Sequence, residues 1–95
     1  MQTEYSQKII REVVVQNKKG LHARPAAKLA VEAQRFTSDI ELVLDGQKVN
    51  GKSIMDILTL AAGFGTGLEV HVQGHDAKEA ADHLCELFRT AIGGL

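Results

Sequence analysis

The order of hydrophobic and polar positions along the chain predicts four β-strands. Residues 9–15 are rich in Ile and Val, which favours a strand. Every second residue over 40–44 is apolar, and an Asp-Gly pair then predicts a hairpin turn into a returning strand over 47–50. The same alternation over 68–73 predicts a fourth strand with one face exposed to water.

Three other segments have the spacing of helices. Residues 23–34 contain alanines and a leucine that recur on one side, and Pro25 is compatible with a helix there because it falls in the first turn. A short helix is expected over 53–60 and a longer one over 76–92. The expected buried face of the last helix consists of Ala77, Ala80, Ala81, Leu84 and Phe88.

Capping residues support the starts of the second and third helices. Ser53 can accept an N–H bond from its first turn, and Asp56 three residues later can reach back toward it. Asp76 and Glu79 repeat this spacing before the last helix. Both pairs therefore predict helix N-termini.

The resulting order is β-α-β-β-α-β-α. Strands that alternate apolar and polar residues indicate an antiparallel sheet with one covered face. We therefore expect an α/β (α+β) fold, an open-faced two-layer sandwich of a four-stranded antiparallel sheet with three helices on one face. Residues 1–95 form one domain, with a polar N-terminal leader over 1–8.

Composition argues against a nucleic-acid partner. The 11 basic and 12 acidic residues give a formal net charge of −1, whereas a nucleic-acid surface normally needs a strongly basic face. The chain has three Phe, one Tyr and no Trp, which leaves little for stacking on bases.

Localisation follows from cysteine content and hydropathy. Cys85 is the single cysteine and cannot form an internal disulfide, which fits a reducing compartment. The first residues, MQTEYSQK, have no apolar run of signal length, and no segment approaches the ~20 apolar residues of a membrane span. We expect a cytoplasmic protein without membrane insertion.

The stretch KKGLHARPAAKLA, residues 18–30, places a histidine at the expected start of the first helix. If the helix begins at Ala23, His22 is the N-cap, where unpaired N–H groups and the positive end of the helix dipole favour an anion. The dipole disfavours the imidazolium and leaves a ring nitrogen free as a nucleophile. Arg24 adds a planar cation that suits phosphate oxygens. These features suggest a histidine that accepts a phosphoryl group, the alternative being a loop histidine that only caps the helix.

Two other patterns do not predict sites. The glycines of GFGTG, residues 63–67, follow a helix and precede a strand, the reverse of a dinucleotide-binding loop. His71, His75, His83 and Cys85 lack the spacing of a zinc site. We expect no metal and no cofactor.

Three segments together resemble the histidine-containing phosphocarrier protein (HPr) family of the bacterial phosphotransferase system. GLHARPAAKL (20–29) resembles the family's active-site motif, and GKSIMDILTLAAG (51–63) resembles its second motif. GTGLEVHVQGHDAKEAADHL (65–84) resembles its last strand and helix. The similarity extends over about residues 9–92 and implies an HPr-like fold in agreement with the predicted element order.

The resemblance implies a role for each residue of the first motif. His22 would be phosphorylated on Nδ1 by enzyme I, which takes the group from phosphoenolpyruvate, and would pass it to a histidine or cysteine of a downstream component of the enzyme IIA type. Arg24 would stabilise the phosphohistidine. Gly20 and Pro25 would shape the loop and helix start, with Ala23 a common variant between them. The chain would be a stoichiometric carrier, not an enzyme.

The second motif implies regulation and docking. In many members of the family the serine matching Ser53 is phosphorylated by an HPr kinase/phosphorylase. Ile54 and Met55, with Leu21, would form the apolar centre of a partner-docking face. Asp56 departs from the family, in which glycine or lysine is frequent there, so the resemblance leaves open which partner is used and how tightly it binds.

Two alternatives to the carrier remain. One is a regulatory HPr-like binding protein switched by Ser53, a class in which the active histidine can be missing, although His22 and Arg24 are both present here. The other is a small-molecule-binding domain, which would need a pocket that tightly packed alanine-rich helix faces do not favour. A monomer is expected because exchange among partners requires an exposed His22. The sequence does not distinguish the sugar branch of the system from the nitrogen-related branch.

Overall fold

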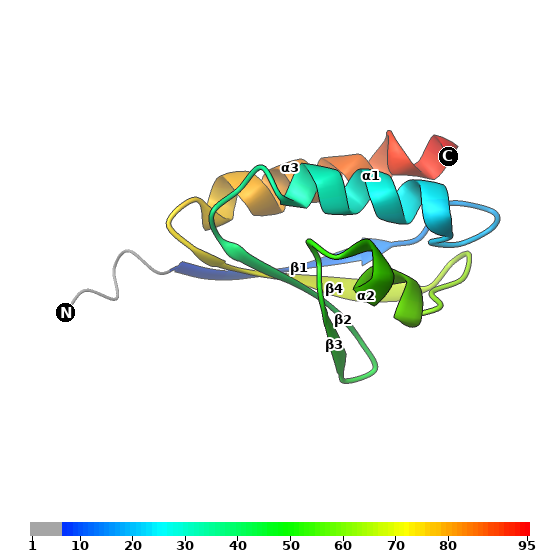
Figure 1. The fold of residues 1–95 in the computed structure, drawn as a ribbon, viewed down its shortest axis with the longest axis horizontal. Coiled ribbons are helices and arrows are strands. Elements are labelled where there is room, and N and C mark those ends of the chain that lie inside the picture. Colours follow the sequence, from blue (N-terminus) through cyan, green and yellow to red (C-terminus); the bar gives the residue numbers. More distant parts are fainter. Residues whose placement is uncertain (1–6) are drawn as a thin grey trace.

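The computed structural model describes residues 7–95, so most of the leader predicted over 1–8 lies outside the described residues. The first strand begins at Gln7, two residues before the predicted start and inside that leader. Figure 1 shows the chain in the predicted order β-α-β-β-α-β-α, followed by a short 3₁₀ helix. The elements are β1 (Gln7–Val14), α1 (Ala23–Ala33), β2 (Asp39–Leu44), β3 (Gln47–Asn50), α2 (Ile54–Thr59), β4 (Gly67–Gly74), α3 (Ala77–Arg89) and η2 (Ile92–Gly94).

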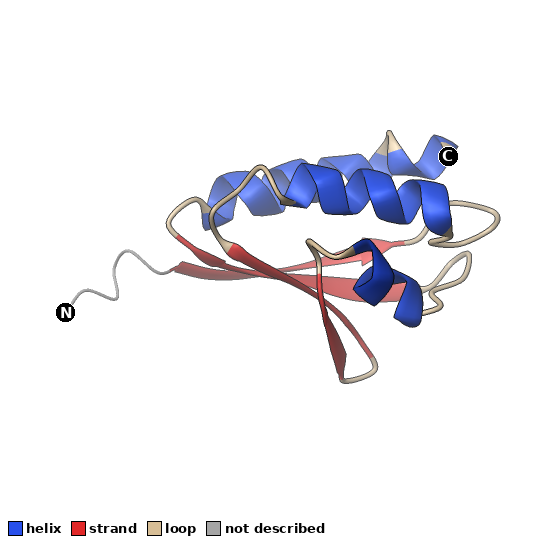
Figure 2. Ribbon diagram, in the orientation of Figure 1, coloured by secondary structure: helices blue, strands red, loops and turns tan. Residues whose placement is uncertain are grey.

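The four strands form one antiparallel sheet in the order β1-β4-β2-β3. In its centre, Val72 of β4 lies opposite both Ile9 of β1 and Ile40 of β2. Figure 2 shows α1 and α3 on one side of this sheet, with α2 beside them, and no described helix on the other side. The predicted open-faced sandwich is confirmed.

The core lies between the covered sheet face and the helices. The alternating residues Leu68, Val70 and Val72 of β4 are buried there, as the pattern predicts. All five residues of the predicted buried face of α3 are also buried. The burial of one large apolar side chain stabilises the fold by about 1.5–3 kcal/mol. The largest fully buried side chains include Phe88, Leu29, Leu42, Ile57, Leu84 and Ile92.

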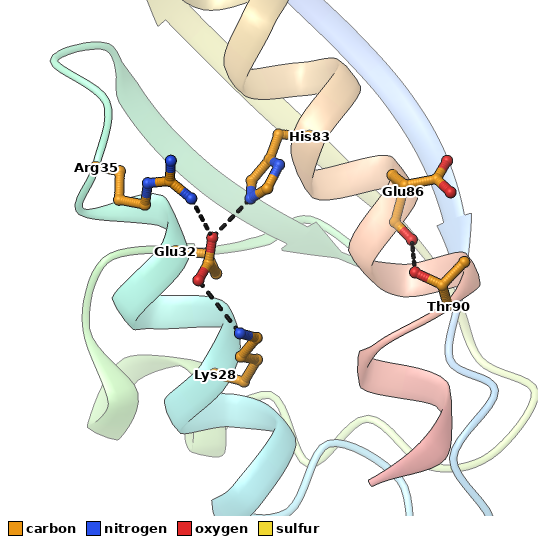
Figure 3. Close-up of polar contacts among 6 residues, drawn as sticks. All are labelled: Lys28, Glu32, Arg35, His83, Glu86 and Thr90. Atoms are coloured by element: carbon orange, nitrogen blue, oxygen red, sulfur yellow. Dashed lines mark hydrogen bonds and ion pairs between the residues drawn. The ribbon is translucent and has the colours of Figure 1, made fainter.

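The last helix is shorter than the predicted 76–92. Thr90 leaves the helical conformation, with φ −123° and ψ −81°, so α3 ends at Arg89. The Thr90 hydroxyl donates to the carbonyl of Glu86 at 2.8 Å and satisfies an acceptor of the final turn (Figure 3). Among residues 7–95, no helix is long and apolar enough to cross a membrane.

The predicted capping role of Asp76 is wrong. Its side chain makes no cap bond to α3 and instead accepts the N–H groups of Thr37 and Ser38, both at 3.0 Å, and the Ser38 hydroxyl at 2.5 Å. Desolvation alone would raise the pKa of Asp76, but these three hydrogen bonds outweigh it and lower the pKa to about 2. Asp76 therefore joins the start of α3 to the loop before β2.

Glu32 links α1 to α3 (Figure 3). Its Oε1 atom lies 2.7 Å from Nε2 of His83 and 2.9 Å from the guanidinium of Arg35, and its Oε2 atom lies 3.3 Å from Nζ of Lys28. The bond to His83, followed by that to Arg35, lowers the pKa of Glu32 to about 2. The ring of His83 also packs at 5.7 Å from that of Phe36.

Candidate functional site

Gly20 holds the loop before α1 against the segment that follows α2. Its φ is +74°, which favours glycine. A Cβ atom at this position would lie 2.5 Å from the Ala62 carbonyl oxygen and 2.9 Å from Cα of Gly63. Leu21 donates its N–H to the same Ala62 oxygen at 2.9 Å. Glycine is therefore required here by both conformation and space.

His22 is the N-cap residue of α1, as predicted. Its extended backbone, φ −81° and ψ −168°, lets its N–H donate to Gly20 and its carbonyl accept from Ala26. The imidazole makes no cap bond to the first turn of α1. The side chain is half-buried, and its Nε2 atom is covered without a hydrogen-bond partner among the described residues.

The first turn of α1 presents donors next to this ring. Pro25 is buried and has no N–H, and the N–H of His22 is already used, so the unpaired N–H groups of the helix start are those of Ala23 and Arg24. Arg24 is exposed and makes no ion pair within residues 7–95. The first turn contains no acidic residue. An anion beside His22 would thus meet two backbone donors and one cation.

Ser53 is the N-cap of α2, as predicted. Its Oγ atom accepts the N–H of Asp56 at 3.2 Å and lies 3.3 Å from the Oδ1 atom of the same residue. The predicted reciprocal bond differs, because Oδ2 of Asp56 accepts from the N–H of Asn50 at 3.1 Å, while the N–H of Ser53 donates to the Asn50 carbonyl. Asp56 therefore fixes the turn before α2 as well as the helix start.

The three predicted docking residues do not form one exposed set. Ile54 and Met55 are 38% and 73% exposed, but Leu21 is only 4% exposed and belongs to the core. Leu21 is buried because its loop is bonded to Ala62, a contact distant in sequence. Sequence reasoning missed Phe64, which is 67% exposed in the turn after α2. An aromatic residue between two turn glycines was the available signal.

The histidines set aside above have other partners. Nε2 of His71 lies 2.7 Å from Glu69, and His83 contacts Glu32. Burial raises the pKa of the half-buried Cys85 thiol. In the part of the chain that the structure describes, no group of three or more His, Cys, Asp or Glu residues could hold a metal ion.

A hollow of about 580 Å³ lies on the open sheet face, away from His22. It is lined by residues of β1, β2 and β4 and of the turn between β2 and β3. Charged residues at this hollow include Glu12, Asp45 and Glu69.

Comparison with known proteins identifies the class of protein to which this chain belongs. A family model described as "PTS HPr component phosphorylation site" matches residues 9–90. The chain belongs to this HPr family of phosphocarrier proteins.

Relatives with different names match most of the chain. The chain is 50% identical over 74 residues to the HPr-like protein Crh of Bacillus subtilis, covering 78% of this chain and 87% of Crh. It is 44% identical over 81 residues to the phosphocarrier protein HPr of Treponema pallidum, covering 85% and 92%.

Solved structures of HPr from Thermoanaerobacter tengcongensis share the fold. One, of HPr-C-His, aligns with a TM-score of 0.85 at 37% identity and covers 92% of this chain and 97% of that chain. The other, described as an HPr dimer, aligns with a TM-score of 0.72 at 40% identity and covers 83% and 91%.

Proposed function

We propose that this protein is a phosphoryl carrier of the phosphotransferase system that accepts a phosphoryl group from enzyme I on His22. The observation that carries the proposal is the placement of His22 at the N-cap of α1 with its imidazole free of any cap bond. Family membership supports the same role.

Nδ1 of His22 is the proposed acceptor atom. Nε2 is covered and unpartnered, so an incoming group approaches the ring from the other nitrogen. The lone pair of Nδ1 attacks the phosphorus of the donor phosphohistidine on enzyme I, the donor P–N bond breaks, and a new P–N bond forms. A side chain of a downstream component of the enzyme IIA type then attacks the same phosphorus. The P–N bond to His22 breaks, and His22 returns to its free state. The chain is thus consumed and regenerated stoichiometrically and is not an enzyme.

The first turn of α1 would stabilise the transferred group. The N–H groups of Ala23 and Arg24 and the guanidinium of Arg24 supply positive charge where phosphate oxygens collect. Gly20 and Pro25 hold this turn in place through the loop contact and the fixed helix start. An exposed helix end both stabilises the phosphohistidine and leaves it open to the next acceptor.

Docking would use the exposed apolar residues on and after α2. Ile54 and Met55 lie on the first turn of α2, and Phe64 follows it in the turn before β4. A flexible methionine suits a surface that meets several partners. Removal of any of these side chains should weaken the encounter with enzyme I more than it weakens the fold.

The second candidate is a regulatory binding protein switched at Ser53 by an HPr kinase/phosphorylase. The similarity to Crh, an HPr-like protein, favours it. The two functions differ in which residue takes the phosphoryl group, and they can coexist in one chain.

Incubation with enzyme I and phosphoenolpyruvate tests the carrier. The native chain and Ser53→Ala should both acquire an acid-labile, alkali-stable phosphoryl group, and His22→Ala should acquire none. A folded native chain that takes up no phosphate from an active cognate enzyme I would contradict the proposal.

A cytoplasmic monomer is the form that suits this cycle, because His22 must reach successive partners. Size-exclusion chromatography with light scattering tests the monomer. A stable dimer, as in the relative described above, that blocks transfer to His22 would contradict it.

A further inference from the structure

The carboxylate of Asp56 makes hydrogen bonds both to Ser53 at the start of α2 and to the turn before it. Its Oδ1 atom lies 3.3 Å from the Ser53 hydroxyl and its Oδ2 atom accepts the N–H of Asn50 at 3.1 Å. Its own N–H donates to Ser53 Oγ at 3.2 Å. The carboxylate cannot turn away from Ser53 without losing the bond that closes the preceding turn.

Phosphorylation of Ser53 would change this pair from attractive to repulsive. The hydroxyl hydrogen that faces Oδ1 is replaced by phosphorus, so the serine loses its donor toward the carboxylate. The new group carries a charge of about −1.5 to −2 near neutral pH. Two anionic groups then lie within a few ångströms of each other, at which distance like charges repel even near a surface.

Lys52, the basic residue next to Ser53, already has a partner. α2 contains no basic residue. Lys52 precedes Ser53, but its Nζ atom donates to the carbonyl of Phe36 at 2.7 Å, just beyond the end of α1. In addition, Gln34 donates to the carbonyl of Lys52 at 2.9 Å. The Lys52 ammonium group is thus already engaged at the Phe36 carbonyl.

We infer that Asp56 makes Ser53 a disfavoured phosphorylation site and biases this protein toward transfer through His22. The inference rests on the second candidate function in one respect, namely that Ser53 is the residue that a kinase would modify. In the reaction itself, Ser53 Oγ would attack the terminal phosphorus of a nucleoside triphosphate bound by the kinase. The bond from that phosphorus to the bridging oxygen breaks, a nucleoside diphosphate leaves, and the hydroxyl proton passes to a base of the kinase.

Thermal unfolding of the full-length chain with phosphoserine installed at position 53 during synthesis tests the inference without a kinase. In the native background, phosphoserine should lower the unfolding temperature by about 5 °C, a typical shift for a domain of this size that loses a modest interaction. In Asp56→Asn, which keeps the shape but removes the charge, phosphorylation should change the temperature by less than about 2 °C. High salt should reduce the native effect.

Glu79→Gln is the matched control because it removes an exposed carboxylate from the first turn of α3. Phosphoserine should destabilise this variant as much as the native chain. Asp56→Gly provides a second background if Asp56→Asn folds poorly. An equal effect in the Asp56 variants and the native chain, or a gain in stability on phosphorylation of the native chain, would overturn the inference. Transfer to His22 is measured on the unphosphorylated chain, so its failure is a separate result.

Discussion

Replacement of Glu32 by Gln should destabilise the protein in a pH-dependent way. Glu32 joins α1 to α3 through His83 and also pairs with Arg35 and Lys28 (Figure 3). Its side chain is 14% exposed, so these contacts are partly shielded from water. Gln keeps the size of the side chain and one acceptor but removes the charge.

The magnitude follows from the pKa of Glu32, about 2 against an ordinary 4.5. One pKa unit corresponds to about 1.4 kcal/mol, so the full difference would be about 3 kcal/mol. Arg35 and Lys28 are 63% and 43% exposed, and solvent screens such pairs. We therefore expect Glu32→Gln to cost about 1–2 kcal/mol at pH 7. For a domain of this size the unfolding temperature should fall by roughly 5–10 °C.

The sign of the pH dependence is set by the depressed folded-state pKa. The stabilising contribution is complete above the unfolded pKa of 4.5 and is lost as the pH falls toward the folded pKa of about 2. Circular dichroism melts of the native chain and Glu32→Gln should therefore differ most at pH 6–7, draw closer as the pH falls below 4.5, and converge only near pH 2. Glu79 is exposed on α3, so Glu79→Gln should differ little from the native chain over the whole pH range. A Glu32→Gln difference that stays constant with pH, or that matches the Glu79→Gln control, would refute the reasoning.

Two further substitutions test the loop and the corrected docking face. Gly20→Ala should lower the free energy of unfolding by about 2–4 kcal/mol, because it adds a clash with Ala62 to the cost of positive φ. Gly65→Ala, also at positive φ but in open space, should cost about 1 kcal/mol in the same urea titration, and equal costs would contradict the contact. Leu21→Ala should cost about 2–5 kcal/mol, whereas Met55→Ala should stay within about 0.5 kcal/mol yet slow transfer from enzyme I. A reversal of these two effects would restore Leu21 to the docking face.

Much of the fold can be predicted from the sequence because its patterns are local. The Asp-Gly turn separates β2 from β3, and β3 occupies the predicted residues 47–50. The Ser53 cap depends only on a residue three positions later. His22 is likewise placed at its N-cap by neighbours within three positions, among them Pro25. The position of the proposed acceptor histidine could therefore be predicted before the tertiary structure.

The errors came from contacts between residues far apart in the sequence. Leu21 looks like a surface residue beside an exposed histidine, but its loop is bonded to Ala62 and its side chain enters the core. Asp76 has the local spacing of a cap, yet Ser38, from the segment before β2, takes its carboxylate. Phe64 lies in a turn, as the glycines around it predict, but its exposure depends on what packs around that turn and does not follow from the local sequence.

The measurement that tests the central claim most directly is phosphorus NMR of the chain after incubation with enzyme I and phosphoenolpyruvate. The account predicts one phosphoryl group per chain, bonded to Nδ1 of a histidine, absent from His22→Ala and retained in His83→Gln. A group on Nε2, a group that persists in His22→Ala, or no phosphohistidine at all would contradict it.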